Sequence, residues 1–409
     1  MTRMKESGID WIGQIPEEWE LGRVKDFYKF FTGFTPDTSR VEYYGDINDF
    51  VWVTIADMTS KKIESSKQTL SDIFIKEKRP QVSRLGSLLY SFKLSVGKVA
   101  FANTDLYTNE AIATFEDGPN INLRFLYYSS YLIEFNSETN IYGAKLLNSD
   151  RIRNACIVQP SLSEQTKIAD FLDKETAQLD KAKALLEEQI QKLKDYRASL
   201  IYETVTKGLD KTVPMKDSGI DWIGQIPEGW GVSRLKYYFD IYAGGDIDER
   251  NTVEECSESH PYPVLSNSLE NEGVLGYTNK YRFKKNCVTV TGRGDVGKAV
   301  YRNINFYPVV RLLVCVPKSQ VDCRFVTYWI NSAIIEKNQT AVSQLTIQML
   351  GELLFVNVPF LVQKNIADFL DKETIQIDKL IQIKNQQIDN INKQRQTLIY
   401  DYVTGKRRV

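Results

Sequence analysis

Apolar side chains recur at heptad spacing in two separate stretches of the chain, near residues 164–207 and 360–406. Glu, Lys and Gln residues fill most of the positions between them. Such spacing predicts two long coiled-coil helices, with two independent amphipathic helices as the alternative. The packing positions are Leu172, Leu179, Leu186, Leu193 and Leu200 in the first stretch and Leu370, Ile377, Ile391 and Leu398 in the second.

The ends of the first helix carry recognisable signals. Ser161 and Glu164 have the spacing of a capping box, and Gly208 is a suitable terminator. The two helices match in length and register, which favours antiparallel pairing with each other over two separate helices.

The regions between these helices, residues 20–160 and 231–358, have a different pattern. Short runs of aromatic and β-branched residues alternate with turn signals, as in residues 49–58, 86–94, 287–301 and 308–317, and these runs predict strands and hairpins. Residues 122–135 and 322–337 predict amphipathic helices at corresponding places. Each region is therefore expected to be a mixed α/β domain.

Two blocks of sequence occur twice. The string SGIDWIGQIPE stands at residues 7–17 and 218–228, and IADFLDKET stands at residues 168–176 and 366–374. Such duplication predicts a pseudo-twofold molecule in which each short block packs against the end of one long helix. The packing residues expected in these blocks are Trp11, Ile12, Ile15 and Trp19 and, in the second copy, Trp222, Ile223, Ile226 and Trp230.

The predicted fold class is therefore α+β, with two mixed α/β domains separated by a pair of long antiparallel coiled-coil helices. The first domain is assigned to residues 1–160 and the first helix to residues 161–208. The second domain is assigned to residues 209–358 and the second helix to residues 359–409.

Composition narrows the function classes. The 409 residues contain a single histidine, His260, and five cysteines without CxxC spacing. Most hydrolytic metal sites and nucleophile–base triads use at least one histidine, so an enzyme is disfavoured and no metal site is expected. Unpaired thiols, no apolar run of 18 residues and no secretory signal together predict a cytoplasmic protein.

The net charge is −1, so any nucleic-acid partner requires local concentrations of positive charge. Two basic segments with interleaved Tyr and Phe, residues 76–98 and 277–302, occupy matching places in the two domains. A solvated strand face is the alternative, but the recurrence favours contact with DNA phosphates. The candidate residues here are Arg79, Arg84, Lys93 and Lys98 in the first domain and Lys284, Lys285, Arg293 and Lys298 in the second.

One segment imitates a nucleotide-binding loop. GRGDVGKA at residues 292–299 has the GxxxxGK spacing, but Ala299 replaces the Ser or Thr that binds magnesium and a β-like run follows in place of a helix. The segment is therefore predicted to be a hairpin turn, like FKLSVGKVAF in the first domain.

Taken together, the chain resembles the specificity subunit of type I restriction-modification systems. The resemblance covers essentially the whole chain. It depends on the repeated SGIDWIGQIPE openings, the TGFTPDTS segment followed by Trp52, and the IADFLDKET helix starts. The second domain departs from the Gly-x-Thr-Pro pattern, with AGGDIDER at residues 243–250.

The resemblance implies a non-catalytic subunit that binds an asymmetric bipartite DNA target, with one domain per half-site and the helices as spacer. It implies methyltransferase subunits, two in number, and restriction subunits as partners. No cofactor is expected on this chain, since S-adenosylmethionine, ATP and Mg belong to those partners. Loops equivalent between the domains are expected to read bases through Thr54, Asp57, Ser266 and Asn267. Lys93, Lys98, Arg293 and Lys298 are expected to contact the DNA backbone or guanine edges. A scaffold that binds proteins in place of DNA is the alternative.

Overall fold

The computed structural model describes residues 3–46, 49–93, 95–139, 145–247, 249–333 and 344–409. The chain packs as two compact units. Unit 1 comprises Met1–Leu185 with Gln387–Val409, and unit 2 comprises Leu186–Gln386. This division follows packing, so each unit contains part of both long helices.

Unit 1 contains a mixed sheet with strand order β4-β11-β8-β9-β6 and a smaller sheet with order β10-β5-β7. Short antiparallel pairs β1-β2, β3-β14 and β12-β13 accompany them. The strands are β1 (Met4–Glu6), β2 (Gln14–Pro16), β3 (Glu20–Arg23), β4 (Phe30–Thr32), β5 (Phe50–Val53), β6 (Lys62–Ile63), β7 (Thr69–Leu70), β8 (Leu88–Ser91), β9 (Val99–Ala102), β10 (Tyr107–Thr108), β11 (Ile112–Phe115), β12 (Glu138–Thr139), β13 (Lys145–Leu146) and β14 (Cys156–Gln159).

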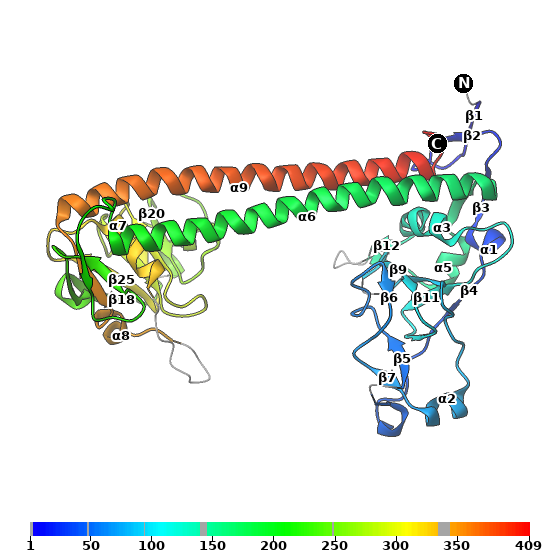
Figure 1. The fold of residues 1–409 in the computed structure, drawn as a ribbon, viewed down its shortest axis with the longest axis horizontal. Coiled ribbons are helices and arrows are strands. Elements are labelled where there is room, and N and C mark those ends of the chain that lie inside the picture. The colour runs from blue at the N-terminus through cyan, green and yellow to red at the C-terminus, as the bar shows by residue number, and fades with distance from the viewer. Residues whose placement is uncertain (1–2, 47–48, 94, 140–144, 248, 334–343) are drawn as a thin grey trace. The chain divides into compact units, whose positions relative to one another are not determined.

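The helices of unit 1 are α1 (Val24–Phe27), α2 (Asp72–Lys78), α3 (Leu123–Ser129), α4 (Tyr131–Glu134), α5 (Ser149–Asn154) and the first part of α6 (Leu162–Lys207), with the 3-10 turn η1 (Val41–Tyr43). Among them, α3 lies close to the first long helix, whereas α2 lies at the end of the domain that holds β5 and β7 (Figure 1). β8 is buried along its whole length, as expected for a central strand.

Unit 2 repeats this plan with a sheet of order β18-β25-β22-β23 and a second sheet of order β19-β21-β20-β24. The pairs β15-β16 and β17-β26 match β1-β2 and β3-β14. The strands are β15 (Met215–Asp217), β16 (Gln225–Pro227), β17 (Gly231–Arg234), β18 (Phe239–Ala243), β19 (Thr252–Val253), β20 (Tyr262–Leu265), β21 (Val274–Thr278), β22 (Cys287–Thr291), β23 (Ala299–Arg302), β24 (Tyr307–Pro308), β25 (Leu312–Pro317) and β26 (Leu354–Asn357).

The helices of unit 2 are α7 (Cys323–Ser332), α8 (Ile347–Gly351), the last part of α6 and the first part of α9 (Phe360–Val403), with the 3-10 turns η2 (Leu235–Tyr237), η3 (Glu249–Asn251) and η4 (Glu270–Gly273). The predicted hairpin over residues 287–301 is confirmed, because β22 and β23 pair antiparallel and residues 292–298 connect them. α7 confirms the start of the helix predicted for residues 322–337, whereas residues 334–337 lie outside the described residues.

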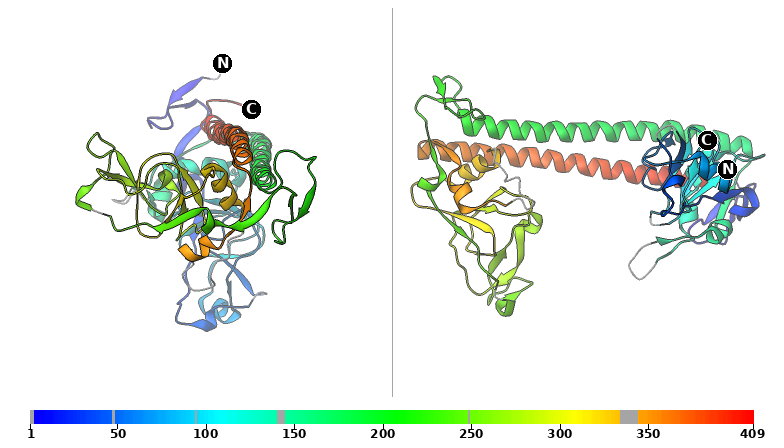
Figure 2. Two further views of the ribbon diagram at one scale, coloured as in Figure 1. Left: turned by 90° about the vertical axis from the view of Figure 1, so that its left-hand side faces the viewer. Right: turned by 90° about the horizontal axis from the view of Figure 1, so that it is seen from below.

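α6 and α9 are uninterrupted over 46 and 44 residues (Figures 1 and 2). In unit 1, Phe171 packs on Tyr402 with ring centroids 4.4 Å apart, and Asp180 lies 3.5 Å from Arg395. Residue numbers therefore increase along α6 while those of the contacting residues decrease along α9, so the two segments in this unit run antiparallel.

Unit 2 repeats this arrangement. Lys384 donates to Gln189 at 2.6 Å, and Arg197 lies 3.3 Å from Asp378. The heptad positions are all buried or half-buried, with Leu172, Leu370 and Ile377 the most enclosed.

Each repeated short block packs against the end of a long helix within its own unit. In unit 1 the Tyr400 hydroxyl donates to the carbonyls of Trp11 (3.2 Å) and Ile12 (3.4 Å). In unit 2 the Tyr202 hydroxyl donates to Trp222 (2.7 Å) and to Ile223 (3.3 Å). This confirms the packing role predicted for both copies.

In each unit the mixed α/β domain is joined to the long helices by a matched polar network. In unit 1, Arg124 of α3 bonds Asp173 of α6 at 2.8 Å, and the Tyr128 hydroxyl donates to the same carboxylate at 2.6 Å. Lys61 adds a third contact to Asp173 at 2.7 Å. Burial disfavours the ionised carboxylate, but these three hydrogen bonds outweigh it and hold the pKa of Asp173 below its usual range.

The lowered pKa of Asp173 predicts acid sensitivity of unit 1. Because folding favours the ionised form, its contribution to stability is complete above about pH 4 and is lost as the pH falls further. Asp173→Asn should therefore lower the melting temperature at pH 7 and flatten its fall between pH 5 and pH 3. Thermal melts across this range are the measurement, with Asp10→Asn at an exposed position as control. Parallel pH profiles for wild type and Asp173→Asn would contradict the prediction.

Candidate nucleic-acid interface

In unit 1, three strands end at the same rim of the mixed α/β domain. β5 and β10 pair in parallel, so the turns that follow them, beginning at Thr54 and Asn109, lie side by side. The turn after β8, which contains Lys93, joins them around a hollow of about 610 Å³. Parallel strand ends are a common place for ligand-contacting loops, because the backbone there is exposed while the strands hold it in place. We call the residues that follow these three strands rim 1.

The side chains of rim 1 are partly occupied by each other. The Thr54 amide and hydroxyl both donate to Asp57, at 2.8 Å and 2.7 Å. The Lys98 ammonium donates to the carbonyl of Ile55 at 3.1 Å, which ties the hairpin turn to the same loop. The structure thus brings Thr54, Asp57, Lys93 and Lys98 together, as expected for a common surface.

Unit 2 has the equivalent rim, formed by residues that follow β20, β22 and β24, and we call it rim 2. β20 and β24 again pair in parallel. Asn267, the second residue after β20, accepts from the Gly292 amide at 2.8 Å and donates to the Val310 carbonyl at 3.2 Å. Ser266 donates to the Gly273 carbonyl at 3.1 Å. Both predicted base readers are therefore bonded within the chain, and their role toward DNA stays a prediction.

A close backbone approach holds each rim, and glycine is required for it. A Cβ added to Gly33 would lie 1.9 Å from the carbonyl oxygen of Thr108, and one added to Gly244 would lie 1.9 Å from that of Val309. Gly33 belongs to the TGFTP segment and Gly244 to AGGDID. The second domain therefore keeps the glycine of the first although the following Thr-Pro is absent.

The other four predicted DNA-contacting residues lie away from the rims, three of them just before the central strands β8 and β22. Arg84 precedes β8 and pairs with Asp105 at 2.9 Å, and Arg79 terminates α2 in a left-handed conformation. Lys284 and Lys285 precede β22 and are exposed. The structure does not bring these four residues to the rims.

A buried arginine supports the loop that continues from rim 2. Arg302 is 6% exposed, and it donates to the Thr289 hydroxyl at 2.9 Å and to the Glu272 carbonyl at 3.1 Å. Burial among these neutral partners lowers the pKa of Arg302 to about 10. The loop that it holds contains Asn271 and Glu272, both with positive φ, a conformation that non-glycine residues rarely adopt.

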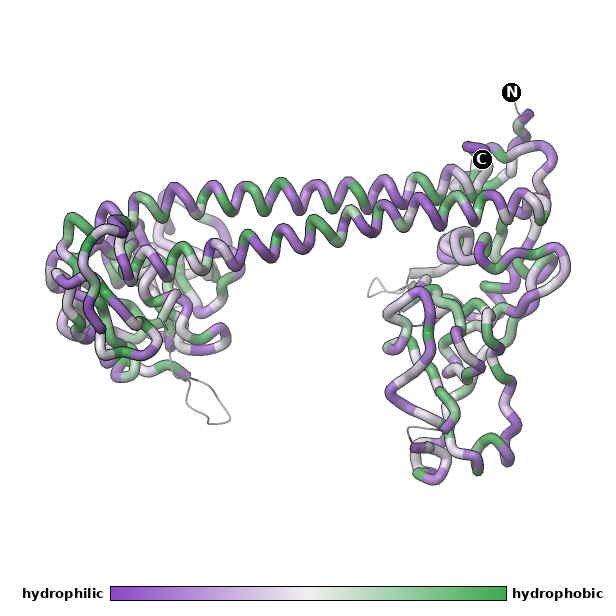
Figure 3. Tube along the Cα trace, viewed as in Figure 1, coloured by the Kyte–Doolittle hydropathy of each residue, from purple (hydrophilic) through white to green (hydrophobic). Residues whose placement is uncertain are grey.

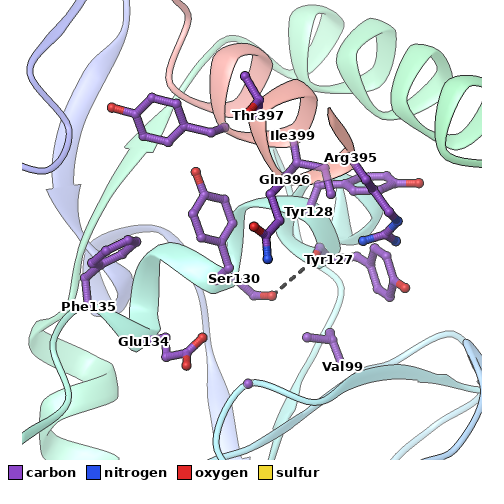
Figure 4. Close-up of a pocket in the computed structure, with 13 residues that line it drawn as sticks. Val99, Tyr127, Tyr128, Ser130, Glu134, Phe135, Arg395, Gln396, Thr397 and Ile399 are labelled. Atoms are coloured by element: carbon purple, nitrogen blue, oxygen red, sulfur yellow. Dashed lines mark hydrogen bonds between the residues drawn. The ribbon is translucent and has the colours of Figure 1, made fainter. Parts of the chain in front are cut away.

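Each hairpin turn also reaches a hollow against the long helices of its unit. In unit 1 the hollow has a volume of about 630 Å³ and is lined by Val99, Tyr127, Glu134, Arg395 and Gln396, among others. Figure 4 shows Arg395, Gln396 and Ile399 of α9 facing the side chains of α3 and α4. The equivalent hollow in unit 2 is lined by Lys298, Tyr328 and Arg197. The hairpins are thus linked to the helices as well as to the rims.

The structure adds residues to the rims that sequence reasoning did not select. In rim 1, Thr35 of the TGFTP segment bonds Glu110, and Asn109 caps the turn by accepting from the Ala111 amide at 3.2 Å. In rim 2, Arg311 follows β24 with a φ of 72°. The TGFTP segment was a usable signal for Thr35, whereas Arg311 lies in an apolar run that predicts only a strand.

Among the described residues, no group of three or more His, Cys, Asp and Glu side chains is placed to hold a metal ion. Within the same part of the chain, no helix combines the length and apolarity needed to cross a membrane.

The structure thus has two mixed α/β domains of similar topology, each with polar and basic side chains at a rim of matched strand ends. The family described as the type I restriction modification DNA specificity domain matches residues 16–194 and 227–393. The chain belongs to this family. The resemblance to type I specificity subunits, inferred from the repeated blocks, is thereby confirmed.

Individual relatives agree. The specificity subunit of the type I restriction enzyme MjaVIII from Methanocaldococcus jannaschii is 23% identical over 433 residues, covering 97% of this chain and 94% of the relative. The EcoBI specificity subunit from Escherichia coli is 28% identical over 53% of this chain and 50% of its own. The chain spans only 35% to 64% of the length of the first three curated relatives that it matches.

The fold has solved counterparts. A chain from a structure concerning complex assembly and conformational transition of the type I R-M system superposes with a TM-score of 0.75 at 16% identity, covering 95% of this chain and 98% of that one. The HsdS subunit from Thermoanaerobacter tengcongensis gives a TM-score of 0.51 at 16% identity, covering 96% and 98%. At such identity the likeness establishes the two-domain mixed α/β fold alone.

Proposed function

We propose that this chain is the DNA-recognition subunit of a type I restriction-modification complex and binds an asymmetric bipartite target, one half-site per domain. One observation carries the proposal: the two rims share their construction but differ in side chains. Rim 1 presents Lys93 and Ala111 where rim 2 presents Arg293 and Arg311. Like frames with unlike side chains suit two unlike half-sites, because base identity is read by side-chain groups in the grooves.

The long helices act in this proposal as the spacer that fixes the half-site separation, paired as an antiparallel coiled coil. The contacts within each unit support the pairing, and the alternation of apolar and polar positions along both helices supports a seam (Figure 3).

The same helices also serve in this proposal as the docking surface for the methyltransferase and restriction subunits. On α9, within unit 2, Ile375, Leu380 and Ile383 are 67%, 47% and 42% exposed. Exposed apolar side chains on a helix whose other exposed residues are mostly polar or charged are typical of a protein interface. Lys174 and Lys372, identical in the two repeats and exposed in both, support two equivalent docking sites for two methyltransferase subunits.

Catalysis is assigned to the partners. S-adenosylmethionine, ATP and Mg are expected on them, and this chain is expected to act without a cofactor, in the cytoplasm. The competing proposal is a scaffold whose two domains bind proteins.

DNA binding and salt dependence separate these proposals. The chain, complexed with methyltransferase subunits from its host, should bind DNA carrying its target, and the logarithm of the affinity should fall linearly with the logarithm of the salt concentration. With 6–10 phosphates neutralised, the loss is about 10³- to 10⁵-fold between 50 and 200 mM salt. A scaffold that binds proteins would show neither this affinity for target DNA nor its dependence on salt.

Genomic methylation gives the decisive readout. Modified adenines should form a bipartite motif that disappears when this chain is deleted and returns when it is restored. An unchanged methylation pattern on deletion would refute the proposal.

A further inference from the structure

Rim 2 differs from rim 1 at the point where the β22 turn meets the β25 turn. In rim 1 the Phe92 amide donates directly to the Ala111 carbonyl at 2.9 Å, and the Phe92 ring is buried. In rim 2 the equivalent amide, that of Gly292, donates instead to Asn267, and a Cβ on Gly292 would lie 2.4 Å from the Arg311 carbonyl. In rim 1 the two turns are therefore joined by a direct hydrogen bond between backbone groups. In rim 2 the side-chain amide of Asn267 bridges them instead, beside Gly292.

This replacement brings two arginines to one place. Arg293 follows Gly292, and Arg311 follows Val310, so the two residues bonded by the Asn267 amide are the immediate neighbours of both arginines. The Arg311 backbone is left-handed, with φ at 72°. Non-glycine residues rarely adopt this strained conformation, and those that do cluster at functional sites.

Within the part of the chain that the structure describes, no salt bridge neutralises either guanidinium. The Nε atom of Arg293 is buried without a hydrogen-bond partner, and among the described residues no carboxylate pairs with Arg293 or Arg311. Other arginines of unit 2 differ in this respect, since Arg234 pairs with Glu352 and Arg324 pairs with Asp371. Two arginines carried by neighbouring backbone segments, without a carboxylate partner among the described residues, are suited to an external partner rich in acceptors.

We propose that Arg293 and Arg311 read guanine in the half-site bound by unit 2, and that Asn267 is the positioning residue that holds both. The inference rests on the proposed function and adds a base identity to it. A guanidinium donates two parallel hydrogen bonds to O6 and N7 of guanine, a fit that depends on orientation. Phosphate contact needs only proximity, for which neither the strained backbone at Arg311 nor the Asn267 bridge is required.

The proposal is tested on the complex with its methyltransferase subunits, by mapping methylated motifs for wild type, Arg293→Ala, Arg311→Ala and Arg311→Lys. Each variant should relax one guanine position in one half of the motif and leave the other half and the spacing unchanged. Discrimination at that position should fall about 10- to 100-fold. Arg311→Lys should relax it too, because lysine keeps the charge but loses the paired donors. Asn267→Ala should relax both positions together.

Lys318→Ala is the matched control. Lys318 lies after the opposite end of β25 and pairs with Asp240, so its loss removes a charge far along the same strand and should leave the motif intact.

A second measurement does not depend on the variants folding. Target DNA with 7-deazaguanine at single positions lacks the N7 acceptor, and wild-type complex should lose about 10-fold in affinity at the guanines that the arginines read. Arg311→Ala should show no further loss at its own position.

If wild-type affinity is insensitive to 7-deazaguanine throughout both half-sites, or if the arginine variants methylate the wild-type motif, the guanine assignment is overturned while the recognition function stands. Absence of any bipartite motif in the wild type refutes the recognition function itself.

Discussion

Gly244→Ala should lower the free energy of unfolding of unit 2 by about 3 kcal/mol, the upper part of the range for overpacking a closed site. The added methyl group would lie 1.9 Å from the Val309 carbonyl oxygen, which belongs to the backbone of rim 2 and cannot rotate away. Relief requires the segment after β18 to separate from the turn after β24. The variant should therefore lose recognition of one half-site as well as stability.

The first domain offers the matched experiment. Gly33→Ala places its methyl group 1.9 Å from the Thr108 carbonyl oxygen, so it should damage unit 1 to a similar extent and affect the other half-site. Gly229→Ala is the control, because no atom lies within 4 Å of its added Cβ. Denaturant unfolding and target binding are the measurements. Equal stability of Gly244→Ala and Gly229→Ala would show that the rim tolerates a wider separation.

Arg324→Met should cost about 2–3 kcal/mol, the range for hydrogen bonds to charged groups whose partners are left unsatisfied. Arg324 connects α7 to α9 through Asp368 and Asp371 at 2.8 Å each, and it also pairs with Asp322, the N-cap of α7, at 2.9 Å. Its removal leaves three carboxylates close together, which repel one another as well as losing their donor. Thermal unfolding at low salt is the measurement.

The carboxylates supply the control for this prediction. Asp368→Asn in the Arg324→Met background removes one of the three unpaired charges and should recover part of the lost stability. If Arg324→Met melts with the wild type, the network is a surface feature without energetic weight, as many exposed ion pairs are.

The long helices and the repeated blocks were predictable because their signals are local and periodic. Leu172 and Leu370 are buried, as expected from heptad spacing, and Tyr400 and Tyr202 bond the two copies of the short block. The identical strings also indicated which parts of the chain would be structurally equivalent.

The rims were only partly predictable, because their geometry depends on strand pairing far apart in sequence. Lys98 was selected for its charge. Its contact with the Ile55 carbonyl depends on the β8–β9 hairpin lying against the loop after β5, an arrangement that the sequence around Lys98 does not indicate. Asn267 was selected as a polar loop residue, but no sequence signal indicates that both ends of its amide are bonded internally. Arg311 was missed because a left-handed arginine inside an apolar run resembles an ordinary strand residue.

Unit 1 is formed by two segments from opposite ends of the chain, which has a consequence for folding during synthesis. One hydrophobic cluster of this unit unites Ile12 and Trp19 with Ile399 and Val403, residues separated by nearly the whole chain. Unit 2 is continuous from residue 186 to residue 386 and leaves the ribosome while that cluster still lacks its last members. Domains usually fold in the order of their synthesis. In this chain, the part translated first completes its core last, so its unfinished apolar surface must wait for the C-terminal helix turns to emerge.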